Sequence, residues 1–365
     1  MKKKYKILKW TLGVVATIII LLVSLGFWIK SLVPPKDTAI EASQVQNLAY
    51  VTQNVPELRG KILAVVTSTE IMGNTEKVTG YELTELARAY YVFKANGFDV
   101  DVASPLGGEA PVVLDDEDMG VYDYAFLNDA EAQQKTLHTL QLKDVSPEDY
   151  EAVYFVGGKG AMFDFPDNTS IQSIVKSYYE NGKVIAAVCH GPAALVNVTL
   201  NNGKPLVADK TISSFTNQEE LLLIPDADTV FPFLLQDKLV EQGANFNEGA
   251  MYLEHMSHDN NLITGQNPWS VWVLAETVIK QLGYEPKHRP ITSEEHAVSI
   301  LITYENKGKA AAKQHIENIM LNKKESVSRL LIAKHGILGI MKGDLKQFSN
   351  VLDLASYAKK LEQEE

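Results

Sequence analysis

The sequence predicts an α/β fold, in which a doubly wound parallel sheet with helices on both faces follows a transmembrane helix and precedes a helical C-terminal extension. Two observations predict the sheet. Short β-branched apolar runs alternate with helical patterns, as in βαβ units, and glycines close most of the helical patterns. A third observation, a long uncharged run near the N-terminus, predicts the transmembrane helix.

The expected strands and helices follow one another along the first three quarters of the chain. The strands are expected at 61–68, 98–104, 153–156 and 183–188, and the helices at 79–96, 171–181 and 267–282. Because βαβ crossovers are right-handed, these strands align in one direction and their carboxyl ends share an edge of the sheet. A ligand site is expected at that edge.

The uncharged N-terminal run, Trp10–Ile29, is about as long as the roughly 20 residues that span a bilayer. It is longer than the apolar region of a signal peptide, and no A-x-A-like cleavage site follows it, so an uncleaved anchor is favoured over a cleaved signal. The positive-inside rule then predicts a single-pass protein of the cell membrane with a cytoplasmic N-terminus and an extracytoplasmic catalytic domain. The lysines behind this orientation are Lys2, Lys3, Lys4, Lys6 and Lys9.

Composition divides the chain into four segments. They are a basic tip and anchor (1–36), a polar tether (37–58), the sheet domain (59–286) and the helical extension of two to four helices (287–365). The extension carries no readable chemistry, and we expect it to dock a protein partner, lie on the membrane or cover a homodimer surface. Within the sheet domain, an acidic insertion over 105–149 follows a strand end, where it forms either a lid or a solvated loop.

The formal net charge of −12 is unevenly distributed, because the N-terminal segment is basic. The middle of the chain is therefore more acidic than the total indicates. Such a body repels nucleic acid, which is excluded as a partner, whereas small neutral substrates are indifferent to it.

Cys189 is the only cysteine of the chain. A single cysteine is a reactive thiol, a small buried hydrophobe or half of an intermolecular link. It falls where the strand 183–188 gives way to Gly191-Pro192, which starts a predicted helix. A sharp strand-to-helix turn exposes a nucleophile above the sheet, and a helix N-terminus favours thiolate. Ala187, however, stands where the strict elbow pattern has glycine.

The segment Ala-Val-Cys-His-Gly-Pro-Ala (187–193) resembles the nucleophile segment of the ThiJ/PfpI superfamily, in particular its branch of glutathione-independent glyoxalases and heat-inducible chaperones. Further similar segments occur in the same order and span about residues 60–285; they include Thr79-Gly80 with Glu85, 98–108, 142–150, 156–164, 214–220 and 262–268. The resemblance implies a flavodoxin-like sheet and a cysteine nucleophile. It does not extend to the N-terminal run or to the C-terminal extension.

By position, the resemblance implies that Cys189 is the nucleophile, His190 its proton carrier and Glu85 a carboxyl group that approaches the thiol from the first helix. In an apolar pocket that carboxyl would stay partly neutral and could donate to a thiolate. Glu82, three residues earlier, is its competitor. Glu220 is the acid expected to orient His190, with Glu219 as the alternative.

The Gly157-Gly158 turn fits an oxyanion site, because glycine permits backbone angles that point amides at a substrate. Lys159 follows in the same substrate-binding segment, where the family often has histidine, and this change could alter substrate preference. No cofactor is implied. A zinc site is unsupported, because there is no second cysteine and no H-E-x-x-H spacing; His255 and His258 are expected to be solvated.

These residues favour a cofactor-free enzyme that acts on a small dicarbonyl, such as methylglyoxal with lactate as product, or on glycated protein. Cys189 would add to the aldehyde, and His190 or Glu85 would move a proton between the two carbons. One alternative is an amide or peptide hydrolase of the same superfamily. Another is a non-enzymatic membrane-tethered holdase or redox sensor in which Cys189 is oxidised.

Overall fold

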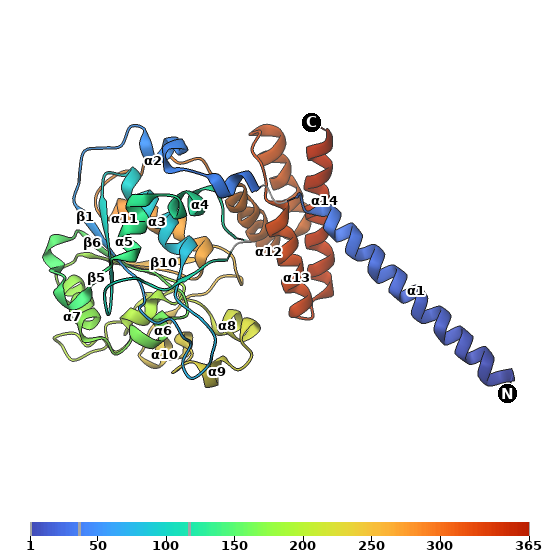
Figure 1. Ribbon diagram of the computed structural model, residues 1–365, viewed down its shortest axis with the longest axis horizontal. Coiled ribbons are helices and arrows are strands. Elements are labelled where there is room, and N and C mark those ends of the chain that lie inside the picture. The colour runs from blue at the N-terminus through green and yellow to red at the C-terminus, as the bar shows by residue number, and fades with distance from the viewer. Residues whose placement is uncertain (1, 36–37, 116–117, 365) are drawn as a thin grey trace. The chain divides into compact units, whose positions relative to one another are not determined.

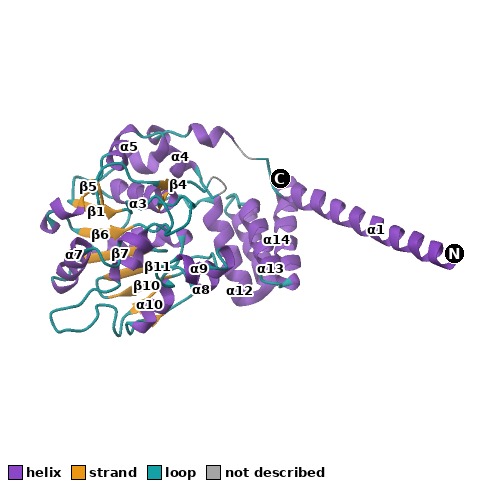
Figure 2. Cartoon of the chain, turned by 60° about the horizontal axis from the view of Figure 1, so that its bottom comes forward, coloured by secondary structure: helices purple, strands orange, loops and turns teal. Residues whose placement is uncertain are grey.

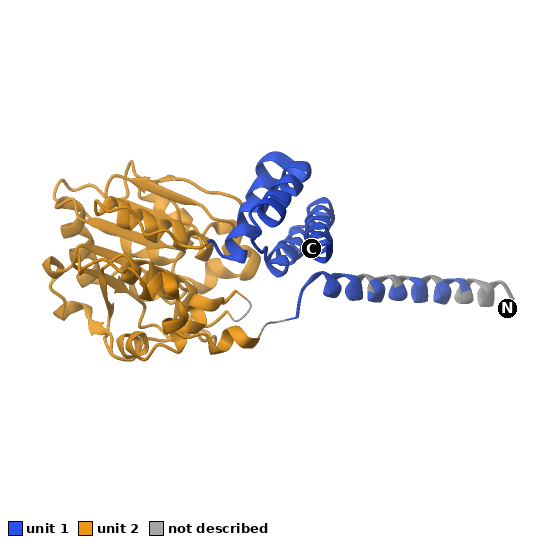
Figure 3. Ribbon diagram, turned by 90° about the horizontal axis from the view of Figure 1, so that it is seen from above, with its two compact units in different colours: residues 1–36, 291–365 blue, residues 37–290 orange. Residues whose placement is uncertain are grey.

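The computed structural model describes residues 2–35, 38–115 and 118–364, and the side chains of all of these except residues 2–9, 14, 18, 21, 22 and 25. The chain forms two compact units (Figure 3). One comprises residues 37–290, and the other comprises residues 1–36 together with 291–365. Figure 1 shows the elements in chain order.

The unit of residues 37–290 is built on a seven-stranded sheet with the order β10-β11-β7-β6-β1-β3-β5, which Figure 2 shows from one side. The strands are β1 (Lys61–Val65), β3 (Asp99–Ser104), β5 (Leu140–Gln141), β6 (Ala152–Phe155), β7 (Val184–Val188), β10 (Met256–Asp259) and β11 (Leu262–Gly265). All neighbours are parallel except β10 and β11. The chain leaves β1 toward β3 on one side and later occupies β6 on the other, so the order reverses there. A ligand crevice is expected at such a reversal.

Two short parallel pairs lie outside this sheet. They are β2 (Tyr81–Glu82) with β4 (Val112–Val113), and β8 (Thr211–Ile212) with β9 (Asn245–Phe246). The α-helices of the unit are α2 (Ala49–Thr52), α3 (Leu83–Ala95), α4 (Val121–Leu127), α5 (Ala130–Leu137), α6 (Ala161–Asp164), α7 (Thr169–Glu180), α8 (Asn217–Leu223), α9 (Ala227–Val230), α10 (Leu235–Glu241) and α11 (Val271–Gln281). The short 3-10 helices are η1 (Thr38–Ala42), η2 (Val45–Asn47), η3 (Leu142–Asp144), η4 (Pro147–Asp149), η5 (Gly191–Leu195) and η6 (Pro268–Ser270).

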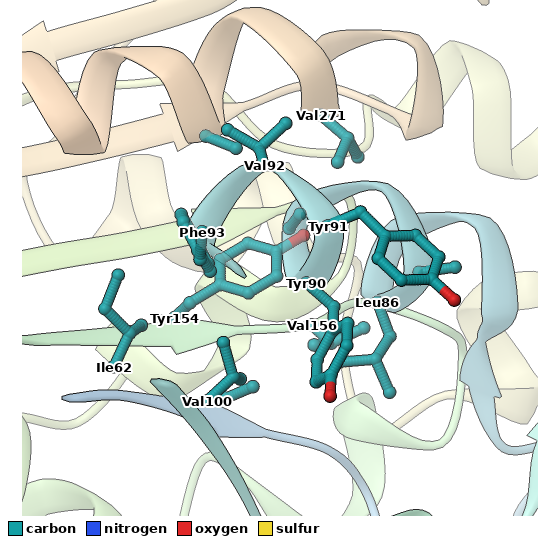
Figure 4. Packing of buried hydrophobic residues seen from close by; sticks show 14 of the residues in the cluster. Ile62, Leu86, Tyr90, Tyr91, Val92, Phe93, Val100, Tyr154, Val156 and Val271 are labelled. Carbon is teal, nitrogen blue, oxygen red and sulfur yellow. The ribbon is translucent and has the colours of Figure 1, made fainter. Parts of the chain in front are cut away.

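The sheet is buried on both faces, as its unbroken apolar runs predict. Side chains alternate along β1, so that Ile62 and Ala64 enter one core while Leu63 and Val65 enter the other. The first core is packed by α3 and α11, and the second by α7 and η5. Figure 4 shows part of the first core, where side chains of α3 meet those of the sheet and of Val271 in α11. α3 is thus anchored by buried side chains along most of its length.

Two local predictions differ from the structure. The helix expected from residue 79 begins only at Leu83, because the chain before it is extended in β2. At Gly80 a Cβ would lie 2.2 Å from the carbonyl oxygen of Pro111, so the backbones of two segments touch there and a helix is excluded. The helix expected after Cys189 is the five-residue 3-10 helix η5, which is too short to build a substantial dipole.

The predicted transmembrane helix is wrong. Among the residues that the structure describes, no helix is both long and apolar enough to cross a membrane. The prediction treated the lack of charge in Trp10–Ile29 as an unbroken apolar surface, but the described residues of this run include Thr11, Gly13, Thr17 and Ser24. The predicted anchor, the single-pass location and the extracytoplasmic catalytic domain all depend on this helix and are therefore not supported either. The side chains of the flanking lysines at 2–9 lie outside the described residues.

The other unit is helical in its described residues. It contains α1 (Lys2–Leu32), α12 (Ser293–Glu317), the π-helical turn η7 (Asn318–Asn322), α13 (Arg329–Met341) and α14 (Leu345–Glu364). α12 is kinked at Gly308, whose φ is 81°. α13 and α14 approach closely at Gly339, where a Cβ would lie 2.9 Å from the amide nitrogen of Phe348. Arg329 joins the end of α1 by donating to the carbonyl oxygen of Leu32 at 2.6 Å.

Candidate active site

Cys189 follows directly after β7 in a strained backbone conformation. Its φ is +58°, in the left-handed region that costs a non-glycine residue roughly 1–2 kcal/mol. The conformation is held from both sides, because the amide of Cys189 donates to Gly265 and its carbonyl oxygen accepts from Phe215, each at 2.9 Å. Gly191 completes the turn, since a Cβ there would lie 2.2 Å from the carbonyl oxygen of Phe155. The turn is therefore a nucleophile elbow, although Ala187 departs from the usual pattern.

The ring of His190 lies between the thiol of Cys189 and the carboxyl group of Glu220. Its Nδ1 lies 3.3 Å from Cys189 Sγ, and its Nε2 lies 2.5 Å from Glu220 Oε2. A Glu220 carboxylate can only accept, so Nε2 carries the proton of this hydrogen bond and Nδ1 is the ring nitrogen that faces the thiol. Burial raises the pKa of Glu220, but the charge and hydrogen bond of His190 outweigh it and hold this pKa below its usual value. The three residues are arranged in the order expected of a thiol, a base and an acid that orients the base.

Glu219, the alternative partner for His190, has a different place. Its Oε2 closes a capping box with Thr216 at the start of α8, and its Oε1 accepts from the amide of Tyr252 at 2.7 Å. Gln266 and Asn267 also donate to Oε1. Glu219 thus fixes the segment around Tyr252, while its neighbour Glu220 faces His190.

Glu85 lies in the first turn of α3, fully buried beside the thiol. Its Oε2 accepts from the amide of Gly157 at 2.7 Å. Burial raises the pKa of Glu85 well above its usual range, and nearby Glu82 raises it further. Burial therefore favours the protonated form of Glu85, whose proton can be donated to a sulfur anion.

The thiol of Cys189 is protonated at rest. Burial raises its pKa well above the usual value, a charged Glu85 would raise it more, and the charge of Lys159 lowers it. The sequence predicted that a helix N-terminus would stabilise the thiolate. The short 3-10 helix η5 does not provide such a helix dipole. Nδ1 of His190, 3.3 Å from Sγ, is within reach of the thiol proton.

The Gly157-Gly158 turn follows β6 and passes over the same site. A Cβ at Gly157 would lie 2.5 Å from Glu85 Oε2 and 2.8 Å from Cys189 Cβ, so only glycine fits. Its amide is already used by Glu85 and is not available to an oxyanion. Gly158 has a φ of +101°. The amides of Gly158 and His190 have no intramolecular acceptor among the described residues.

A cavity of about 450 Å³ opens onto this centre. Cys189, His190, Glu85, Gly158 and Lys159 all contribute to its lining; the other lining residues are Met72, Lys77, Val78, Thr79, Glu82, Val113, Asp115, Asp118, Phe215, Leu223, Ile224, Tyr252, Pro268 and Trp269. The elbow, the turn after β6 and the start of α3 thus meet at one edge of the sheet, as the strand order predicts. Asp115 and Asp118 bring the acidic insertion to this cavity, whereas residues 116–117 of the acidic run lie outside the described residues.

Sequence reasoning placed the acidic insertion near the site, but it missed the contact that holds the insertion there and the position of Glu82 in the cavity wall. Asp115 and Asp118 line the cavity because Arg88, on α3, donates to the carbonyl oxygen of Asp118 at 2.8 Å and pairs with Asp123 at 3.1 Å. No local pattern signals a pair 35 residues apart. Glu82 also lines the cavity, and only its spacing from Glu85 hinted at this.

The described residues include no group of three or more histidine, cysteine, aspartate or glutamate side chains placed to hold a metal ion. His258 is exposed and its Nε2 lies 2.8 Å from the carbonyl oxygen of Asn260. His255 is half-buried, outside the residues that line the cavity.

Comparison with known proteins gives relatives that match this chain over nearly their whole length but over only about three fifths of its own. The sequence profile of the DJ-1/PfpI family matches residues 77–220. Glyoxalase 3 of Candida albicans is 29% identical over 234 residues, which cover 60% of this chain and 96% of that protein. A glutathione-independent glyoxalase of Saccharomyces cerevisiae is 31% identical over 224 residues, which cover 57% of this chain and 92% of the relative.

Solved structures are similar to the same part of this chain. The 24 kDa rapid encystment protein of Francisella tularensis superposes with a TM-score of 0.58 at 37% identity, covering 61% of this chain and 99% of its own. The crystal structure of glyoxalase III from Candida albicans superposes with a TM-score of 0.55 at 26% identity, covering 62% of this chain and 98% of its own. Almost the whole of each relative thus corresponds to about three fifths of this chain.

Proposed function

The chain belongs to the DJ-1/PfpI family, and we propose that it is a cofactor-independent cysteine enzyme that converts reactive dicarbonyls such as methylglyoxal into hydroxy acids. The resemblance to ThiJ/PfpI proteins seen in the sequence is confirmed by these relatives. Glyoxalases of two yeasts, 29% and 31% identical, support an enzyme of this kind. The observation that carries the proposal is the placement of Cys189, His190 and Glu85 around one cavity.

The first step is addition of Cys189 sulfur to the aldehyde carbon, C1. Nδ1 of His190, 3.3 Å from Sγ, takes the thiol proton, while Glu220 holds the ring and stabilises its charged form. Glu85 donates to sulfur as negative charge develops. The amides of Gly158 and His190 are placed to receive the aldehyde oxygen, and the proton on His190 then passes to that oxygen, giving a neutral hemithioacetal.

The second step moves hydrogen within the hemithioacetal. The C1 hydrogen transfers to C2 and the proton of the C1 hydroxyl transfers to the C2 oxygen, which gives a thioester of the hydroxy acid. Water then cleaves the thioester, releases the acid and restores the thiol. From methylglyoxal the sum is one dicarbonyl and one water to one lactate, with no net oxidation.

The volume of the cavity favours bulkier dicarbonyls as further substrates. At about 450 Å³, it falls in the range of roughly 300–1,000 Å³ that holds drug-sized ligands. A three-carbon dicarbonyl fills a small part of that space. A glycated side chain of a peptide, which carries the same carbonyl chemistry on a longer arm, is the second candidate substrate.

The decisive experiment is incubation of the full-length protein with methylglyoxal and measurement of lactate. Lactate should appear with the wild type and fall to the uncatalysed rate with Cys189→Ala, which leaves no thiol in the chain. Wild-type protein that is folded but forms no lactate, and no hydroxy acid from phenylglyoxal, would contradict the proposal.

A further inference from the structure

Two glutamates line the cavity, and their side chains are held very differently. Glu85 is fully buried and bonded to Gly157, so it is committed to the thiol. Glu82 accepts only from Thr84 among the described residues: the hydroxyl Oγ1 lies at 3.4 Å, which is long for a hydroxyl donor, and the amide of Thr84 also donates to the carboxyl group. Among the described residues Glu82 has no ion-pair partner within 4.0 Å. Its carboxyl group therefore retains acceptor capacity that faces the cavity.

The backbone of Glu82 lies close to the reacting centre. Its amide donates to the carbonyl oxygen of Gly157 at 3.2 Å, and a Cβ on Gly158 would lie 2.7 Å from the same amide nitrogen. The turn that carries the free Gly158 amide is thus packed directly against residue 82. Because Cys189 lines the same cavity, a substrate bound to the sulfur would lie in a cavity whose wall includes Glu82.

We propose that Glu82 is a further catalytic residue, the base that carries hydrogen between the two carbonyl carbons of the bound substrate. This inference rests on the dicarbonyl activity proposed above. From the sequence alone, His190 or Glu85 would carry the hydrogen between the two carbons. We assign this role to neither, because Nδ1 of His190 faces the sulfur and the carboxyl group of Glu85 is bonded to the amide of Gly157.

The step balances with Glu82 as the sole carrier of the carbon-bound hydrogen. The Glu82 carboxylate removes the C1 proton of the hemithioacetal, and the electron pair of that bond forms a C1–C2 double bond while the C2 oxygen takes the proton of the C1 hydroxyl. The electron pair of the resulting enediolate then re-forms the C1 carbonyl, and Glu82 returns its proton to C2. A thioester remains, and the carboxylate is regenerated.

The charges around Glu82 suit a base that works near neutral pH. Burial raises the pKa of Glu82 to about 7, with Asp115 adding to the shift and Lys159 and Arg88 opposing it; burial also raises the pKa of Glu85, the other neighbouring acid, and so favours its neutral form. A base is most effective when its pKa is close to the working pH. Since the carboxylate is the active form, kcat should rise with pH through about 7.

The test compares Glu82→Gln with wild type in the full-length protein. We expect kcat for methylglyoxal to fall by about 100-fold or more with little change in KM, and the limb near pH 7 to vanish from the profile of kcat. Alkylation of Cys189 by iodoacetamide should keep its wild-type rate, because the thiol and its base are untouched. Glu109→Gln, an exposed glutamate outside the cavity, is the matched control and should leave kcat unchanged.

The outcomes separate this inference from the proposed function. If wild type forms no hydroxy acid, the proposed function fails; if wild type does and Glu82→Gln keeps its kcat, only the role of Glu82 fails. Loss of kcat together with loss of alkylation would also overturn the role, because it would mean that residue 82 supports the thiol. Should Glu82→Gln not fold, Glu82→Asp and Glu82→Asn replace it, and the carboxylate variant must retain more activity than the amide.

Discussion

At Cys189, the backbone conformation favours glycine, whereas the proposed function needs the thiol. The φ of +58° at this residue suits glycine, yet the proposed chemistry requires the cysteine side chain. Cys189→Ala keeps the strain, whereas Cys189→Gly releases it. We expect the glycine variant to have the higher free energy of unfolding, by about 1 kcal/mol, after the larger entropy of glycine in the unfolded chain is deducted.

Urea unfolding of both variants measures this difference. Ala187→Gly, two residues earlier in the regular strand β7, serves as the control and should lose stability, because its backbone gains nothing from glycine. Equal stabilities for the two Cys189 variants would mean that the elbow stores no strain.

At this scale, sequence reasoning located residues better than it located their states. The strand before Cys189 and the Gly191-Pro192 pair predict where the thiol lies, and the match to Thr79-Gly80 selects Glu85. The protonation state of the Cys189 thiol could not be predicted correctly, because it depends on how deeply the sulfur is buried and on the length of η5. The engaged amide of Gly157 and the open carboxyl of Glu82 depend on contacts between segments far apart in the chain.

At the scale of elements, one buried ion pair joins α3 to α4. Arg88 binds Asp123 through Nε at 3.3 Å and Nη2 at 3.1 Å, and Nη2 also holds the carbonyl oxygen of Asp118, which lines the cavity. Arg88→Met leaves the Asp123 charge without its guanidinium partner, so the free energy of unfolding should fall by about 3–5 kcal/mol. KM should rise, because the cavity wall at Asp118 loses its support.

Lys135→Met is the matched control for this pair. Lys135 also bridges two elements, through Asp99 and Asp101, but its side chain is 20% exposed and lies outside the cavity. It should cost less stability and leave KM unchanged. Asp123→Asn combined with Arg88→Met should recover part of the lost stability, since no buried charge then lacks a partner. Similar losses in Arg88→Met and Lys135→Met would argue against a special role of the Arg88 pair.

Element boundaries followed the sequence where local signals act alone. α7, expected over 171–181, begins two residues earlier, after Asn168, whose side chain caps Ser170 and Ile171. Its end at Glu180, just before Gly182, lies within one residue of the expected end. α3 begins later than expected because Gly80 touches Pro111, a contact without a local signature. The membrane prediction failed for a related reason, since a run without charge is not by itself a run with an unbroken apolar surface.

For the whole molecule, activity should reside in residues 37–290. This unit contains both cores and every residue described in the site, and relatives of nearly complete length match only about three fifths of the chain. A fragment of residues 37–290 should therefore fold cooperatively and keep the kcat and KM of the full-length protein for methylglyoxal.

The end point of that fragment matters, because its last residues are docked. Arg289 stacks over Trp272 at 3.9 Å, and the amide of Lys287 donates to Asn96 at 2.7 Å. A fragment that stops at Tyr284 loses both contacts, so its melting temperature should be lower than that of the 37–290 fragment while its site residues stay the same. A folded 37–290 fragment without activity would show instead that residues 1–36 or 291–365 take part in catalysis.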